Sequence, residues 1–180
     1  LFDKLWDSHT VVAQEHGDTL LWVDRHFVHE GSHHAFAKIA SRGLPVARPD
    51  LTFGVADHYV PTRGNRTTAG IADATVRGMV EKLEGNAARH GVRLFGLSDA
   101  GEGIVQVVGA EEGLTLPGTL IVCGDSHAAT HGALGAYAFG IGASQLKQIL
   151  ATQCLWQKKP KTLRITVDGQ LGAVAEAIQR

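Results

Sequence analysis

Three short apolar runs in this chain each end in a polar cluster that holds a carboxylate close to a histidine. LLWV (20–23) runs into DRHFVHE, FGVA (53–56) into DHYVPT, and IVC (121–123) into GDSHAATH. Runs of this length, bounded by polar residues, are typical of buried strands. In open α/β sheets, ligands bind beyond the carboxyl ends of the strands. We therefore expect the three clusters to converge on one pocket.

Helix-like segments alternate with these strands. The clearest helix spans residues 71–91, where Val76, Val80 and Leu83 keep a helical period and Gly91 provides a stop. Further helices are expected in a short segment from Leu1, at 32–42, within 131–140 and at 144–156. Further strands are expected at 93–97, 103–108, 119–123 and 162–169. This alternation predicts a three-layer α/β/α fold with a largely parallel sheet.

The bulk properties exclude several classes of protein. With 180 residues, of which 44% are apolar, and no repeat or linker, residues 1–180 are expected to form a single domain. A net charge of −1 provides no basic field for nucleic acid or an anionic membrane, and no run reaches the ~18 apolar residues of a spanning helix. Two cysteines make no disulfide framework, and LFDKLWDSHT does not resemble a secretory signal. We expect a cytoplasmic protein that binds neither nucleic acid nor membrane.

The residue pairs Asp57–His58 and Asp125–His127 are the strongest candidates for chemistry. A carboxylate that hydrogen-bonds one ring nitrogen of a histidine fixes its tautomer and favours the imidazolium. Each pair therefore predicts a poised acid or a clamp for an anion. Ser126 adds a hydroxyl that can bind a carboxylate or hydroxyl group.

Structural readings of the same residues remain open. Asp24 and Arg25 fit a strand-end ion pair, the pair at 57–58 fits a turn before a proline, and residues 125–127 fit a helix cap. His33 and His34 fall in a helical pattern that favours the surface. GDSH lacks the G-x-S-x-G of a hydrolase elbow and the G-K-[ST] of a phosphate loop. A metal hydrolase built on His58, His127 and nearby carboxylates is a further alternative.

Four long motifs carry a family resemblance. DRHFVHEG, TFGVADHYVPTR, PGTLIVCGDSHAATHGALGAYAFGIGAS and ILATQCLWQKKPKTLRITVDG resemble the large subunit of 3-isopropylmalate dehydratase, in the aconitase superfamily. The resemblance extends from Leu1 to about Gly172. Because that subunit is much longer, the resemblance implies that this chain corresponds to its first, aconitase-like N-terminal domain only.

The resemblance implies a hydro-lyase of branched-chain amino-acid biosynthesis. Such an enzyme dehydrates and rehydrates a 2-hydroxy dicarboxylate of the isopropylmalate or methylmalate type, and a [4Fe-4S] cluster acts on the hydroxyl as a Lewis acid. A small subunit is the implied partner. The site residues implied by the motifs are Asp57, His58, Asp125 and His127 in catalysis, with His29 and Ser126 in substrate binding.

The chain also departs from the family. The three cluster cysteines of the family lie downstream of this segment, and Cys123 and Cys154 are not at their positions, so the cluster ligands are absent from this chain. Gln106 stands where the family has a histidine, and SQLKQ (144–148) replaces SEVEH. Two hypotheses follow: a dehydratase component that is inactive in isolation, or a truncated, non-catalytic paralogue that binds a small dicarboxylate or a partner subunit.

Overall fold

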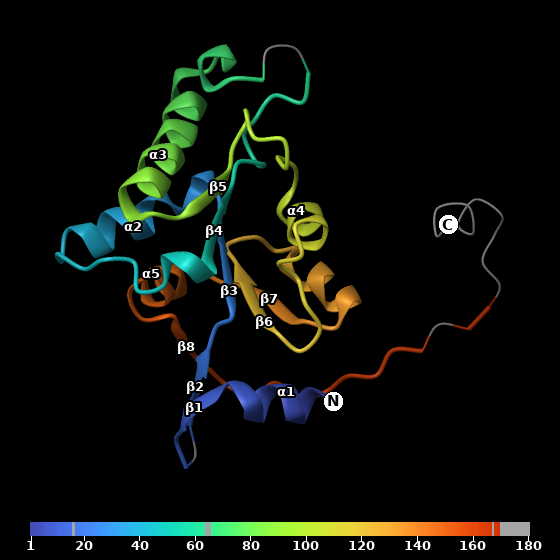
Figure 1. Cartoon of the computed structure of the whole chain (residues 1–180). Helices are drawn as coiled ribbons and strands as arrows, with labels where there is room; N and C mark the ends of the chain where they lie inside the picture. The colour runs from blue at the N-terminus through green and yellow to red at the C-terminus, as the bar shows by residue number, and fades with distance from the viewer. Residues whose placement is uncertain (16, 64–65, 167, 170–180) are drawn as a thin grey trace.

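The computed structural model describes residues 1–15, 17–63, 66–166 and 168–169. Its central element is a sheet in the order β5-β4-β3-β6-β7, in which every neighbouring pair of strands is parallel (Figure 1). The strands have the following bounds: β3 Arg25–Val28, β4 Thr52–Val55, β5 Arg93–Phe95, β6 Leu120–Cys123 and β7 Tyr137–Gly140. The predicted parallel α/β sheet is confirmed.

Helices cover both faces of this sheet and create three layers. α2, α3 and α5 lie on one face, and α4 with the 3-10 helix η4 lies on the other (Figure 1). The helices have the following bounds: α2 His33–Ala40, α3 Ala74–His90, α4 Val105–Glu111, α5 Ala143–Thr152, η1 Glu30–Ser32, η2 Pro49–Leu51, η3 Thr68–Gly70 and η4 Ala128–Leu134. In the part of the chain that the structure describes, no helix is long and apolar enough to cross a membrane.

The side chains of β6 show how the layers form. Leu120 and Val122 are buried in the core beneath α2, α3 and α5, whereas Ile121 and Cys123 are buried in the core beneath α4. Successive side chains of a strand point to opposite faces, so a continuously apolar strand fills two cores at once. β6 therefore lies in the interior of the sheet.

A second, antiparallel sheet has the order β1-β2-β8 and was not expected from the sequence. It pairs a hairpin near the start of the chain with a strand that follows α5. Its elements have the following bounds: α1 Phe2–His9, β1 Thr10–Ala13, β2 Thr19–Trp22 and β8 Cys154–Gln157. The apolar run at 20–23 thus forms a strand, but in this smaller sheet.

Asp24 marks the point where the chain passes from one sheet to the other. Its backbone N–H donates to the carbonyl of Leu120, and its carboxylate accepts the N–H of Leu120 at 2.9 Å. The same carboxylate lies 2.6 Å from Nε2 of His9, and this hydrogen bond raises the pKa of the His9 imidazole. Arg25 donates instead to the backbone carbonyl of Asp24. Asp24 therefore connects elements at the amino end of β3.

Residues 103–108 were expected to form a strand and instead lead into α4. Val105 and Val108 are buried at helical spacing. The N–H of Val105 donates to the Asp57 carboxylate at 2.9 Å. The first N–H groups of a helix have no partner within it, so this tertiary hydrogen bond stabilises a helix that local β-branched content disfavours.

Three further segments differ from the sequence prediction. Within 131–140 the chain forms the end of η4 and then β7, with a left-handed turn at Gly135 (φ 81°) in place of a helix. The helix expected at 144–156 ends at Thr152, because Gln153 adopts a left-handed φ of 58° and the next residues pair with β2. Residues 162–169 form no strand at any described position. Local patterns do not reveal whether a partner strand is within reach.

Candidate active site

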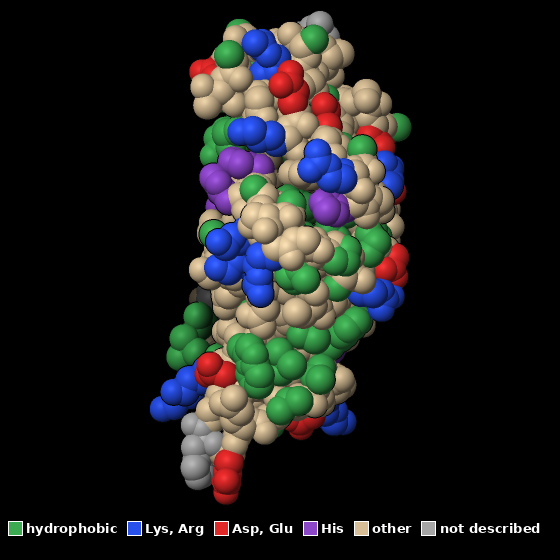
Figure 2. Space-filling view, turned by 90° about the vertical axis from the view of Figure 1, so that its left-hand side faces the viewer, with side chains coloured by type: hydrophobic (Ala, Val, Ile, Leu, Met, Phe, Trp, Pro, Cys, Tyr) green, Lys and Arg blue, Asp and Glu red, His purple; other side chains and the backbone are tan. Residues whose placement is uncertain are grey.

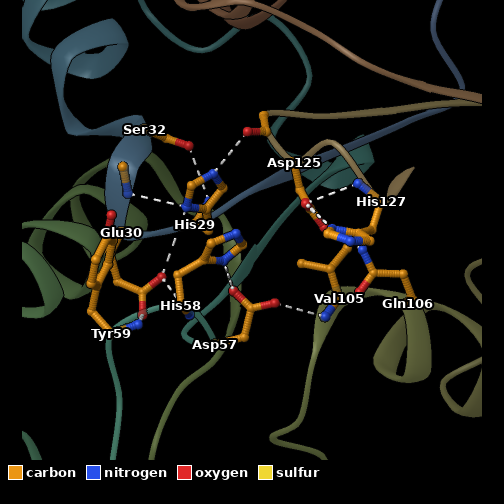
Figure 3. Close-up of polar contacts among 12 residues, drawn as sticks. His29, Glu30, Ser32, Asp57, His58, Tyr59, Val105, Gln106, Asp125 and His127 are labelled. Atoms are coloured by element: carbon orange, nitrogen blue, oxygen red, sulfur yellow. Dashed lines mark hydrogen bonds and ion pairs between the residues drawn. The ribbon is translucent and has the colours of Figure 1, made fainter. Parts of the chain in front are cut away.

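The loops that follow β3, β4 and β6 meet at one edge of the parallel sheet (Figure 3). His29 is the first residue after β3. Asp57 is the second residue after β4, and Asp125 is the second residue after β6. β3 lies between β4 and β6, and parallel strands place their carboxyl ends at the same edge. The expected convergence is therefore present, with β3 rather than the run at 20–23 as the first strand.

An open cleft of about 370 Å³ lies between the loops after β4 and β6 and the start of α4. Its wall includes Asp57, His58, Gln106, Asp125 and His127. This volume is in the range of sites for small organic molecules. Of the six predicted site residues, four thus share one cavity.

One ring nitrogen of His58 pairs with a carboxylate, and the other has no hydrogen-bond partner among the described residues. Its Nδ1 pairs with Asp57, whose second oxygen accepts the N–H of Val105 at 2.9 Å. Partial burial lowers the pKa of His58, but the hydrogen bond to Asp57 and the charges of nearby carboxylates outweigh it and raise the pKa above its ordinary value. No hydrogen bond to another described residue engages Nε2. His58 can therefore hold a proton at Nε2 and release it into the cleft.

The side chain of His29 is more buried than that of His58 and does not line the cleft wall. The two rings stack with centroids 4.1 Å apart and planes 16° apart. Nδ1 of His29 accepts the N–H of Gly31 at 3.2 Å, and Nε2–H donates to the carbonyl of Gly124 at 3.3 Å. Burial and the neighbouring His58 lower the pKa of His29. Its ring is therefore a neutral support for His58, and direct contact of His29 with a substrate stays a prediction.

Asp125 is the centre of the second half of the site. One oxygen accepts the backbone N–H of His127 at 3.0 Å and lies 3.2 Å from its Nδ1, while the other accepts the side-chain amide of Gln106. Burial raises the pKa of Asp125, but these hydrogen bonds prevail and lower it. Asp125 thus stays ionised and holds the turn that presents His127.

Ser126 and His127 are the exposed members of this turn. The His127 ring is 80% exposed, and the hydroxyl of Ser126 lies 3.3 Å from its Nδ1. His127 is part of the cleft wall, whereas Ser126 lies beside it. His33 and His34 lie on α2, half-buried and exposed respectively, in agreement with the surface expectation.

Glu30 is the site residue that the sequence analysis missed. It follows His29 directly and is fully buried, with its carboxylate directed at the loop that carries His58 (Figure 3). The signal was present as HFVHE, because Phe27 and Val28 are the apolar end of the parallel strand β3. The longer apolar run at 20–23 is the stronger strand signal in the sequence, so β3 and the acid that follows it are not recognised from the pattern alone.

The donor atoms of this site do not fit a metal centre. Among the described residues, His29, Glu30 and His58 form the one His, Cys or acidic group compact enough to hold an ion, with ligand atoms within 4.8 Å of one another. Both ring nitrogens of His29 are engaged, Nδ1 by the N–H of Gly31 and Nε2–H by the carbonyl of Gly124, so this ring has no free lone pair for an ion. The alternative pairing of His58 with His127 forms no such group among these residues.

The two cysteines likewise do not fit an iron–sulfur cluster. Both are free, but Cys123 is buried in the parallel sheet, and Cys154 is half-buried in the antiparallel one. Burial raises the pKa of both thiols, whereas a cluster needs thiolates, and a family-type cluster needs three of them. The described part of the chain therefore supplies no site for such a cluster.

The structure thus combines a parallel α/β fold with acid–histidine pairs at the strand ends, and sequence comparison identifies its family. Residues 3–178 match the aconitase family (aconitate hydratase). The chain belongs to the aconitase family.

Three similar curated proteins share one name. The chain is 50% identical over 173 residues to the 3-isopropylmalate dehydratase large subunits of Bacteroides fragilis and of Phocaeicola vulgatus. It is 49% identical over 172 residues to that of Cytophaga hutchinsonii. These matches cover 95–96% of this chain and 36–37% of each relative, so the chain spans less than two fifths of their length.

Proposed function

We propose that residues 1–180 form the N-terminal domain of a hydro-lyase. Its substrate is a 2-hydroxy dicarboxylate of the isopropylmalate or methylmalate type, in branched-chain amino-acid biosynthesis. One observation carries the proposal: His58 lines the cleft with its Nδ1 paired to Asp57 and its Nε2 unengaged by described residues, opposite the turn of Asp125 and His127.

His58 serves as the acid in this proposal. Hydroxide leaves carbon poorly, so its departure needs a proton. In dehydration a C–O bond and a C–H bond on the neighbouring carbon break, and a C=C bond forms between the two carbons. The Nε2 proton of His58 turns the departing hydroxyl into water, and a base from another part of the complete enzyme accepts the proton from carbon. In hydration the same nitrogen takes that proton back. Asp57 stabilises the charged ring and prevents it from turning.

His127 and Ser126 bind the substrate in this proposal. A ring N–H of His127 and the hydroxyl of Ser126 can donate to a substrate carboxylate at the mouth of the cleft. Asp125 takes part by fixing the turn and by keeping a negative charge near His58. His29 is proposed to contact the substrate as well, although its ring supports His58 from below.

The proposed partner and cofactor are those of the relatives' family, and the proposed compartment is inferred from the two free cysteines. The similar proteins are named as large subunits, and we propose a small subunit as the partner of this chain. Any [4Fe-4S] cluster of the family would have to be held by residues other than those of this chain. The free thiols of Cys123 and Cys154 fit a reducing cytoplasm.

Activity of the complete gene product tests the proposal. It would be mixed with its small subunit, reconstituted anaerobically with iron and sulfide, and assayed by the absorbance of the unsaturated product. We expect turnover of isopropylmalate or methylmalate, and a fall in kcat of about 10²- to 10⁴-fold in His58→Gln, the range for a general acid. The control His34→Gln, an exposed residue of α2, should keep wild-type kcat. Absence of turnover in the wild-type assembly, or full activity of His58→Gln, would refute the proposal.

Gln106 favours a second candidate, a paralogue that binds a dicarboxylate without catalysis. Its amide donates to Asp125, but an amide cannot carry a proton as the family's histidine can. Calorimetric titration of malate into the 180-residue chain separates the candidates when combined with the assay above. Binding without turnover, with turnover gained in Gln106→His, supports the paralogue.

A further inference from the structure

Glu30 is a buried carboxylate that forms no ion pair with a lysine or arginine among the described residues. Its side chain is 0% exposed, and the nearest basic group is Nδ1 of His29 at 3.9 Å. That nitrogen accepts a hydrogen bond from Gly31 and belongs to a ring whose pKa is lowered by burial. Removing a carboxylate from water costs several kcal/mol unless hydrogen bonds replace its hydration. The hydrogen bonds that Glu30 accepts therefore indicate the role of this buried carboxylate.

Both oxygens of Glu30 bind the backbone of the loop that carries the acid. Oε2 accepts the N–H of His58 at 3.4 Å, and Oε1 accepts the N–H of Tyr59 at 3.2 Å (Figure 3). These two donors are adjacent in sequence, so the carboxylate holds one short stretch of backbone at two points. The link joins the end of β3 to the loop after β4.

His29 restrains the same loop through contact with the side chain of His58. Its ring stacks on the ring of His58, and its own position is locked by Gly31, Ser32 and Gly124. A Cβ at Gly31 would lie 2.8 Å from Cε1 of His29, so the backbone passes directly against that ring. His58 is thus restrained through its backbone by Glu30 and through its ring by His29 and Asp57.

We propose that Glu30 is a positioning residue for the acid His58, an inference that rests on the proposed function. Its carboxylate fixes the backbone of the loop so that Nε2 of His58 faces the cleft, and its charge favours the proton-holding form of the ring. The groups that face His58 are the carboxylates of Asp57, Glu30 and Asp125 and the neutral ring of His29.

Two substitutions separate the charge of Glu30 from its grip on the loop. Glu30→Gln keeps the length of the side chain but loses the charge, and its NH₂ group opposes one of the two backbone donors. Glu30→Asp keeps the charge but is one methylene too short to reach both donors. The control is Glu111→Gln, the same loss of charge at an exposed position on α4.

Nuclear magnetic resonance of the 180-residue chain tests the proposal without an assay of activity. We expect the pKa of His58 to fall by about 0.5 to 1 in Glu30→Gln, to change less in Glu30→Asp, and to stay constant in the control. Hydrogen exchange at the amides of His58 and Tyr59 should accelerate by about tenfold or more in both variants, the equivalent of one lost hydrogen bond. An unchanged pKa together with unchanged exchange in a folded Glu30→Gln would overturn the proposal.

The reconstituted enzyme supplies the second measurement. Because Glu30 acts through His58, Glu30→Gln should lower kcat about tenfold with KM within about twofold, and should shift the pH profile in the same direction as the His58 pKa. If the wild-type protein proves inactive while the resonance data change as expected, the proposed function fails and the positioning role stands. If turnover is normal and the His58 pKa and exchange rates do not respond, the positioning role fails alone.

Discussion

Single residues in this protein are constrained most tightly where backbone passes against the turn of the site. Gly140, at the end of β7, is such a position: a Cβ there would lie 2.7 Å from the backbone oxygen of Asp125. Real Cβ atoms do not approach an oxygen so closely, and a backbone oxygen cannot rotate away. The glycine is therefore required by the packing of β7 against the turn at 125–127.

Gly140→Ala is expected to destabilise the chain by about 1–3 kcal/mol, the usual cost of forcing extra volume into a packed region. Urea denaturation of the 180-residue chain at pH 7 would measure it. The matched control is Gly132→Ala, because a Cβ at Gly132 meets nothing within 4 Å, and its effect should stay within about 0.5 kcal/mol. Equal stability of the two variants would contradict the packing argument.

At the scale of elements, α3 is the helix that its own sequence specifies best. Asp73 caps it by accepting the N–H groups of Thr75 and Val76 at 2.8 and 3.0 Å, and Gly91 ends it with a left-handed φ of 68°. The expected helix at 71–91 was confirmed as 74–90. Because cap and stop are local features, this helix could be read without knowledge of its neighbours.

Asp73→Ala should cost about 1 kcal/mol of stability, since two helix N–H groups lose their acceptor. Asp73→Ser, which retains a capping oxygen, should recover most of that loss. Thermal unfolding followed by circular dichroism would compare the three proteins. A Ser variant as unstable as the Ala variant would show that the cap is not the cause.

The pairing of α2 with α5 leaves a basic groove on the outer face of the molecule. Lys38, Arg42 and Lys147 line a groove of about 380 Å³ between these helices. Figure 2 shows Lys and Arg side chains gathered on this face. No acidic residue occurs in 31–49 or in 126–166, so these cations have no acid within their own segments.

Lys147→Glu is therefore expected to stabilise the chain, by about 0.5 kcal/mol at low ionic strength, because a carboxylate replaces one of three neighbouring cations. The gain should vanish at about 1 M NaCl, where the screening length is about 3 Å. Urea melts at both salt concentrations would show it, with Lys161→Glu as the control outside the groove. A gain that persists in high salt would point to a cause other than charge.

At the scale of the whole molecule, β3 is the central strand of the parallel sheet, and His26 lies within it. His26 is 0% exposed, and neither of its ring nitrogens has a hydrogen-bond partner among the described residues. Burial lowers its pKa to about 3, from an ordinary value of 6.5. Below pH 6.5 the unfolded chain takes up a proton at this position that the folded chain does not accept, so stability is lost as the pH falls from 6.5 towards 3.

His26→Leu should flatten this pH dependence. The contribution of His26 is about 0.7 kcal/mol for each pH unit at pH 6.5 and approaches about 1.4 kcal/mol for each unit below it, so between pH 6.5 and 5 the variant should lose about 1.6 kcal/mol less than the wild type. Free energies of unfolding from urea melts at several pH values would test it. His34→Leu, at an exposed position, should leave the wild-type slope. A slope in His26→Leu equal to that of the wild type would contradict the assignment.

The sequence by itself determined the class of the fold, the helix at 71–91, and the pairing of acids with histidines at the strand ends. Each of these depends on residues that are close together in the sequence: a helical period, a helix cap, or an Asp-His pair such as Asp57–His58. Family membership likewise followed from contiguous motifs, and the comparisons confirmed it.

Only the tertiary structure decided which sheet each strand joins and which residues support the site. The run at 20–23 pairs with β8, more than 130 residues away, and residues 103–108 lead into a helix anchored by Asp57. Glu30 becomes a site residue only because the loop after β4 lies over it. Pairing partners and buried hydrogen bonds depend on segments far apart in the chain, and a local pattern contains no information about them.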